Sequence, residues 1–133
     1  EESVVVRQQL NVAAINMWQQ SPVFGVGLGN FLVELPKALP SRSVYFLQPV
    51  HNIYLLVLAE TGVVGAVLVI LFVIGVLRHG TWDMKHVSCL LSLVSLLALG
   101  LIDHYPLTLQ QGQLLLTPFV SLNLVANPRK IDK

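Results

Sequence analysis

Charge is scarce in this chain: Asp, Glu, Lys and Arg make up only 11% of its 133 residues, where soluble domains average roughly 25%. Basic residues also form no run longer than two. Nucleic-acid-binding surfaces need clustered Lys and Arg to neutralise phosphates, so we expect no nucleic-acid partner. Hydrophobic residues reach 54% and the mean hydropathy is +0.70, which is typical of an integral membrane protein.

Cysteine is almost absent, since the one cysteine, Cys89, lies alone in an apolar run. This excludes an internal disulfide and a thiolate metal cluster. The sequence starts at Glu1 rather than Met, and it lacks the basic, apolar and small-residue segments of a signal peptide. We therefore expect it to be the C-terminal part of a longer protein.

Three apolar segments approach the length of about 20 residues that a transmembrane helix needs. They cover residues 53–77, 87–102 and 107–126. The third contains several amide side chains, so we expect it to face other helices rather than lipid. The sequence thus predicts an all-α integral membrane protein. An external amphipathic helix and loop in residues 1–50 would precede about three transmembrane helices in residues 51–133.

Lys and Arg are distributed unevenly between the links of these segments. The link between the first two spans and the tail after Ala126 are basic, whereas the link 103–106 contains neither Lys nor Arg. Short basic loops stay in the cytoplasm. We therefore expect a cytoplasmic basic tail, with residues 1–50, His51 and the 103–106 link on the external face.

Residues 3–20 have the periodicity of an amphipathic helix. Its apolar face contains Val6, Leu10, Ala13, Ala14, Met17 and Trp18. Arg7 falls on the same side, where an arginine must snorkel, pair with a buried carboxylate or hold an anionic ligand. The glycine-alternating segment 25–29 that follows either presents backbone amides to the same anion or simply turns tightly.

His51 stands at the start of the first span, where an imidazole can accept a proton from a hydroxyl near neutral pH; the alternative is an interfacial histidine paired with a backbone carbonyl. Asn52 beside it is a favourable helix N-cap.

Glu60 lies nine residues after His51. On a straight helix this separation is a rise of about 13 Å and a rotation of about 180°, so Glu60 is not the partner of His51. We expect Glu60 to bind an arginine, a hydroxyl or a free backbone amide of a neighbouring helix, which Gly62 and Gly65 allow to approach closely.

Asp103 and His104 fall at the outer end of the second span, level with His51 in the expected topology. The spacing of these three residues matches no known metal-binding motif, so we expect no metal. Instead we expect them to line one cavity, where Gln110 and Gln111 offer hydrogen bonds to sugar hydroxyls.

Two segments resemble the C-terminal half of the O-antigen ligase and polymerase superfamily. They are residues 22–31 (PVFGVGLGNF), and residues 51–55 (HNIYL) followed by residues 60–65 (ETGVVG). The resemblance implies a multi-pass glycosyltransferase of the bacterial inner membrane, with its active face external or periplasmic. Such an enzyme moves a glycan from an undecaprenyl diphosphate carrier to a hydroxyl acceptor such as lipid A core, in lipopolysaccharide assembly. It implies no cofactor and no metal, and direct displacement would invert the anomeric carbon.

The resemblance also assigns roles to single residues. His51 matches the family histidine that orients or deprotonates the acceptor hydroxyl, and Arg7 matches an arginine that binds the carrier diphosphate. Arg42 is the candidate for a second such arginine. We expect a further set of residues to bind substrate or line the cavity: Asn52, Tyr54, Asp103, His104, Gln110 and Gln111.

Other functions share these motifs. Within the superfamily they are O-antigen polymerase and protein O-oligosaccharyltransferase. A small-anion membrane transporter is the alternative of another class, with Arg7 and His51 lining the permeation path. A third alternative is that this chain carries no chemistry itself and only packs against and orders a larger site.

Overall fold

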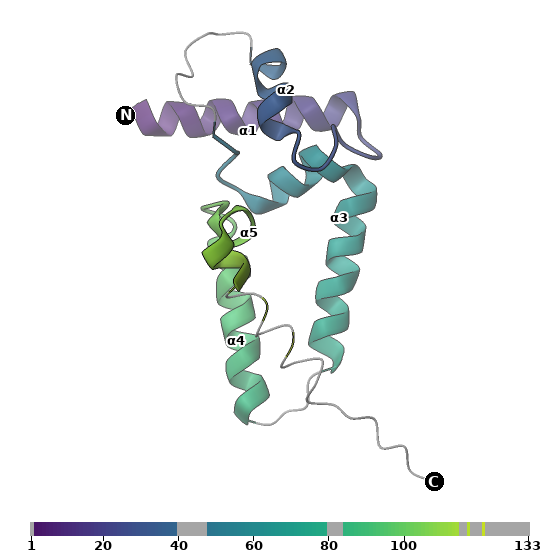
Figure 1. Cartoon of the computed structure of the whole chain (residues 1–133), viewed down its shortest axis with the longest axis vertical. Coiled ribbons are helices and arrows are strands. Elements are labelled where there is room, and N and C mark those ends of the chain that lie inside the picture. Colours follow the sequence, from purple (N-terminus) through teal and green to yellow (C-terminus); the bar gives the residue numbers. More distant parts are fainter. Residues whose placement is uncertain (1, 40–47, 80–83, 115–116, 118–120, 122–133) are drawn as a thin grey trace.

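The computed structural model describes residues 2–39, 48–79, 84–114, 117 and 121. Within them the chain forms helices and loops without a strand, which confirms the predicted all-α class. The helices are α1 (Glu2–Gln20), α2 (Phe31–Ala38), α3 (Ile53–His79), α4 (Met84–Leu99) and α5 (Tyr105–Thr108). Figure 1 shows α1 lying across the top of the molecule, with α3 and α4 running away from it.

The core lies where α1 crosses α2 and the first part of α3. Leu10, Ala13, Ala14 and Met17 are buried on one face of α1, as their spacing predicts. The residues packed around them are Phe31, Leu35 and Ala38 of α2, Val50 before α3, and Leu56 and Ala59 of α3. The apolar face predicted for this helix is therefore confirmed.

Arg7, predicted on the apolar side of this helix, is exposed. The fully buried positions of α1 begin at Leu10, and Val4 and Val5 are also exposed. The start of α1 is thus less covered than the rest of the helix, with Val6 only partly buried against the core. Helical periodicity identifies a face, but it does not show how far the partner elements reach along it.

Helix α3 is broken at Gly62, whose backbone angles are φ 63° and ψ −164°. This conformation is accessible essentially only to glycine. Residues 53–61 run beneath α1, and the helix then turns away from it (Figure 1). The sequence predicted one span over residues 53–77 without a break at Gly62, although the polar residues Glu60 and Thr61 stand directly before it.

Residues 21–30, the glycine loop, supply the hydrogen bonds that the break removes. In an unbroken helix the amides of Val63 and Val64 would bind the carbonyls of Ala59 and Glu60. All four groups bind the glycine loop instead. The bonds join Val26 N to Ala59 O (2.9 Å), Gly27 N to Glu60 O (2.9 Å), Val63 N to Pro22 O (2.9 Å) and Val64 N to Val23 O (3.2 Å). All four backbone groups therefore remain hydrogen-bonded despite the break. An unpaired backbone group in a buried position would cost free energy.

Of the three predicted spans, one is long and apolar enough in the described residues to cross a membrane: Ile53–Val76 of α3. Only 11% of its most apolar stretch is buried, unlike the core helix of a soluble domain. Helix α4 has 16 residues, and its apolar part covers Leu90–Leu99. Most of the third predicted span, 107–126, lies outside the described residues.

Candidate active site

The residues that directly precede α3 in the chain meet those that directly precede α5, although the two segments are distant in sequence. His51 Nδ1 lies 3.5 Å from Asp103 Oδ1, and the ring centroids of His51 and His104 are 5.1 Å apart. We call these three residues the histidine cluster. His104 is buried, whereas the side chains of His51 and Asp103 retain 14% and 24% exposure. The cluster is thus largely enclosed but reachable from solvent.

Hydrogen bonds at the start of α3 hold His51 in this place. Asn52 Oδ1 accepts hydrogen bonds from the amides of Tyr54 and Leu55, both at 3.0 Å, which confirms the predicted N-cap. The Asn52 amide nitrogen donates to Leu101 O at 3.2 Å. Ile53 N donates to Gly100 O at 2.8 Å, and the Tyr54 hydroxyl donates to Leu97 O at 2.8 Å. The start of α3 is therefore fastened to the segment that leads to Asp103.

His104 and Thr108 share a hydrogen bond. Thr108 Oγ1 lies 2.7 Å from His104 Nδ1 and 3.1 Å from His104 O, so its one proton serves one of these two acceptors. When the hydroxyl donates to His104 O, the ring donates from Nδ1 and Nε2 keeps a lone pair. Burial lowers the pKa of His104, Asp103 opposes this and His51 adds to it, so the ring is neutral near pH 7.

Asp103 is fixed by its neighbour in sequence. Its Oδ1 atom accepts a 2.7 Å hydrogen bond from the amide of His104. The same oxygen is the one that faces His51 Nδ1. His51 Nδ1 itself is buried and has no hydrogen-bond partner within the described part of the chain. Within the described residues, the Asp103 carboxylate is thus the polar group that faces this imidazole nitrogen.

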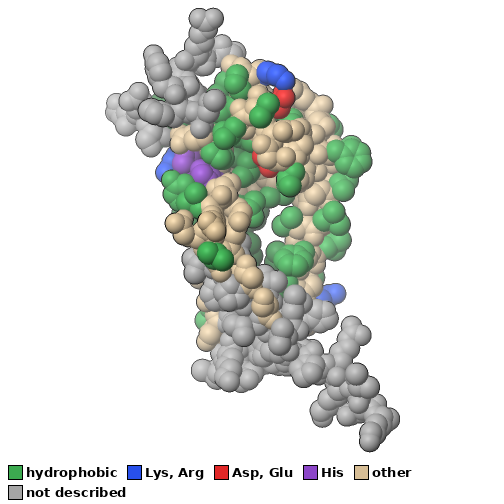
Figure 2. Space-filling view, in the orientation of Figure 1, with side chains coloured by type: hydrophobic (Ala, Val, Ile, Leu, Met, Phe, Trp, Pro, Cys, Tyr) green, Lys and Arg blue, Asp and Glu red, His purple; other side chains and the backbone are tan. Residues whose placement is uncertain are grey.

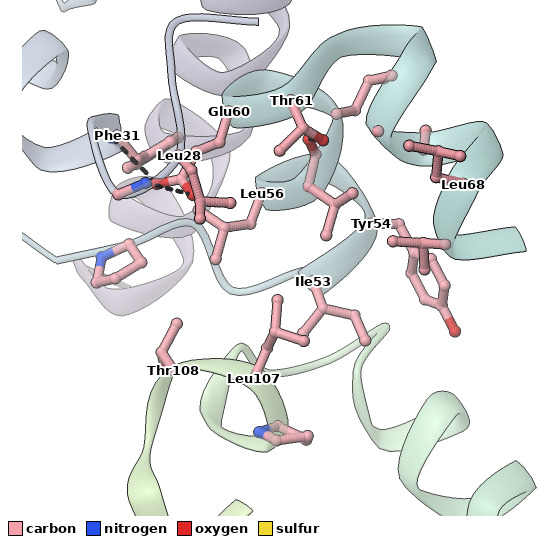
Figure 3. A pocket seen from close by; sticks show the side chains of 18 of the residues that line it. Leu28, Phe31, Ile53, Tyr54, Leu56, Glu60, Thr61, Leu68, Leu107 and Thr108 are labelled. Atoms are coloured by element: carbon pink, nitrogen blue, oxygen red, sulfur yellow. Dashed lines mark hydrogen bonds between the residues drawn. The ribbon is translucent and has the colours of Figure 1, made fainter. Parts of the chain in front are cut away.

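An apolar cavity of about 1070 Å³ opens between α2, α3, α4 and α5. Leu28, Ile53 and Leu107 are among the side chains that surround it (Figure 3). Thr108 also lines this cavity and binds His104. One residue therefore connects the apolar cavity to the histidine cluster.

The family model described as O-antigen ligase matches residues 1–70, more than half of the chain. The chain belongs to the O-antigen ligase family. It matches no curated protein and no solved structure. The family consists of membrane-associated enzymes of the glycosyltransferase or ligase type, which in general use a lipid-linked glycan donor and a polysaccharide acceptor. The matched residues include α1, the glycine loop, His51 and the break in α3, whereas Asp103 and His104 lie beyond them.

Glu60 fastens the glycine loop to the broken helix. Its carboxylate accepts hydrogen bonds from the amides of Gly29 at 2.9 Å and Phe31 at 3.1 Å (Figure 3). A backbone amide was one of the three kinds of partner expected from the sequence. Phe31 is the first residue of α2, so the negative charge also lies at the favourable end of that helix.

Replacing Glu60 with Gln should destabilise the protein by on the order of 1–2 kcal/mol, since one charged acceptor is lost and an NH₂ group then faces a backbone N–H. The midpoint of thermal unfolding of the full-length protein in detergent measures this effect. The matched control is Glu34→Gln, which removes an exposed ion pair with Lys37 of little expected value. Equal midpoints for both variants would contradict the role of Glu60.

The remaining predicted residues have different places. A side chain on Gly62 would meet the backbone of Val23 and Phe24, while one on Gly65 would meet Thr61 of the same helix. Gly62 thus permits close approach of a loop rather than of another helix. Arg42 lies outside the described residues.

Gln110 and Gln111 are exposed and are not among the residues that line the apolar cavity, whereas Gln113 lines it. Thr108 was not identified from the sequence. Its position four residues after His104 is the helical spacing at which side chains meet, so that signal was present.

Proposed function

We propose that this chain carries the acceptor side of the active site of a membrane glycosyltransferase. The enzyme transfers a glycan from an undecaprenyl diphosphate carrier to a hydroxyl acceptor, such as lipid A core, at the external face of the bacterial inner membrane. The observation that carries the proposal is the position of His51 opposite Asp103, in a chain of the O-antigen ligase family. The third member of the cluster, His104, binds Thr108, which lines an apolar cavity.

In this mechanism His51 accepts the proton of the attacking hydroxyl. Asp103 faces Nδ1, so it favours the tautomer with a proton on Nδ1 and a free lone pair on Nε2 for the acceptor. The 3.5 Å separation is long for a hydrogen bond, but such contacts often tighten only when substrate is bound. Asp103 is thus a positioning residue, and His51 is the residue that touches the acceptor.

The diphosphate side of the reaction needs positive charge rather than an acid, because the leaving group departs as an anion. The forked guanidinium of arginine binds such groups well, and Arg7 is exposed on α1 and available for this role. In the view of Figure 2 a basic side chain and histidine side chains are seen at the same edge of the molecule. Direct displacement inverts the anomeric carbon, and the step requires no metal ion or cofactor.

The apolar cavity supports a lipid carrier as donor. Its walls are mostly aliphatic, as suits the isoprenoid chain of a polyprenyl carrier. Thr108 lines the cavity and binds His104, so the histidine cluster lies beside the cavity. An amphiphile with an apolar chain and a charged head therefore fits the arrangement better than a free nucleotide sugar does.

Asp103→Asn tests the proposal. Asn keeps an oxygen for the His104 amide but loses the charge that orients His51. We expect kcat to fall about a hundredfold, the cost of misplacing a reacting group by about 1 Å, with little change in the KM for the acceptor. The assay uses the purified full-length protein, a polyprenyl-diphosphate-linked glycan and a lipid acceptor, with Glu34→Gln as control. An unchanged kcat would remove Asp103 from the mechanism.

A further inference from the structure

The histidine cluster has the donor atoms of a transition-metal site. His51, Asp103 and His104 each offer one ligand atom, and these atoms lie within 4.8 Å of one another. In a tetrahedral zinc site, bonds of 2.0–2.2 Å put neighbouring donor atoms about 3.3–3.5 Å apart. His51 Nδ1 and Asp103 Oδ1 already stand at 3.5 Å. The other separations, which reach at most 4.8 Å, would shorten as a metal draws the three donors together.

The surroundings of these donors also resemble those of metal ligands. A metal-binding histidine usually donates its second ring N–H to a neighbouring group, which fixes the tautomer and the ring. His104 Nδ1 lies 2.7 Å from Thr108 Oγ1; in the tautomer with its proton on Nδ1, the ring donates this bond and Nε2 keeps a lone pair for a metal. Asp103 Oδ1 is held by the His104 amide. His51 Nδ1 is buried without a hydrogen-bond partner among the described residues.

We propose that His51, Asp103 and His104 bind a transition-metal dication of the Zn²⁺ class, and that the bound metal inhibits glycan transfer. Two imidazoles and one carboxylate favour Zn²⁺, Cu²⁺ or Ni²⁺ over Mg²⁺, which takes oxygen ligands. The three residues come from two segments about 50 positions apart, so no sequence motif reveals the site.

Inhibition follows from the chemistry of the imidazole and rests on the function proposed above. A neutral imidazole that binds metal through Nδ1 carries its proton on Nε2. Nε2 of His51 then has no lone pair for the proton of the acceptor hydroxyl. The metal also stands between His51 and Asp103, so it removes the contact that positions the ring.

Metal binding is measured on the purified full-length protein in detergent, freed of metal and titrated with Zn²⁺ against a chromophoric chelator. We expect one saturable site that Mg²⁺ does not compete for. Asp103→Asn and His104→Gln should each weaken binding by about a hundredfold or more, and Thr108→Val by about 10- to 100-fold, as for other groups that hold a metal ligand. His79→Gln, at the far end of α3, is the control and should leave binding unchanged.

The outcomes separate the two proposals. Zinc affinity that is the same in all of these variants, or no saturable binding below millimolar Zn²⁺, would overturn the metal site. Thr108→Val keeps all three ligands, so it tests the site even if a ligand variant fails to fold. Full transfer activity with the site saturated would overturn inhibition. Zinc binding that depends on these residues in a protein without transfer activity would leave the metal site standing and remove the proposed function.

Discussion

Replacing His51 with alanine is expected to lower the rate of glycan transfer by about 10²- to 10⁴-fold, the usual contribution of a general base. The loss should appear in kcat, because the apolar cavity that supports donor binding is not lined by His51. The KM for the lipid-linked donor should therefore change little. This split distinguishes a residue that acts on the acceptor hydroxyl from one that merely shapes the carrier site.

The measurement compares purified full-length proteins with a polyprenyl-diphosphate-linked glycan as donor. His51→Gln is a useful second variant, since it keeps much of the side-chain volume but cannot act as a base near neutral pH. His79→Ala serves as the control histidine, because His79 is the last residue of α3. Transfer that continues at the original rate in both His51 variants would exclude this histidine from the chemistry.

Gly62→Ala is expected to destabilise the protein by about 2–6 kcal/mol. A positive φ combined with a ψ of −164° costs an L-residue about 1–3 kcal/mol, and a methyl group forced against packed atoms adds about 1–3 kcal/mol. Here those atoms are backbone atoms of Val23 and Phe24, which cannot rotate away as a side chain could. The substitution should therefore separate the glycine loop from α3.

Gly75→Ala is the matched control on the same helix. A side chain at Gly75 would meet nothing within 4 Å, and its φ is not positive, so alanine there should be neutral or slightly stabilising. Thermal unfolding of the two full-length variants in detergent gives the comparison. Similar midpoints would show that the break at Gly62 is not required for the fold.

The parts of the fold that depend on local pattern were predictable from the sequence. The spacing of Leu10, Ala13, Ala14 and Met17 predicted the buried face of α1, and the residue type of Asn52 predicted the cap of α3. Both depend on a few neighbouring residues, so a single sequence contains the information. The expected topology likewise put Asp103 and His104 at the level of His51.

The parts that depend on distant partners were not predictable. Gly62 follows Glu60 and Thr61 within an otherwise apolar span, and the break there is stabilised by a loop more than 30 residues earlier in the chain. The exposure of Arg7 depends on how far the elements packed against α1 extend. The 3.5 Å separation of His51 and Asp103 similarly depends on the hydrogen bonds between the start of α3 and the end of α4. No local sequence pattern predicts these bonds.

The break in α3 also has a consequence for depth in the bilayer. The apolar residues after it, 63–77, rise only about 22 Å at 1.5 Å per residue, less than the roughly 30 Å of hydrocarbon. Such a hydrophobic mismatch is met by local thinning of the bilayer or by drawing the flanking residues toward it. Either response brings residues 53–61, and His51 just before them, down to the layer of lipid headgroups. In the function proposed above, the diphosphate of the carrier lipid would lie in that same layer, so the donor would reach His51 without leaving the membrane.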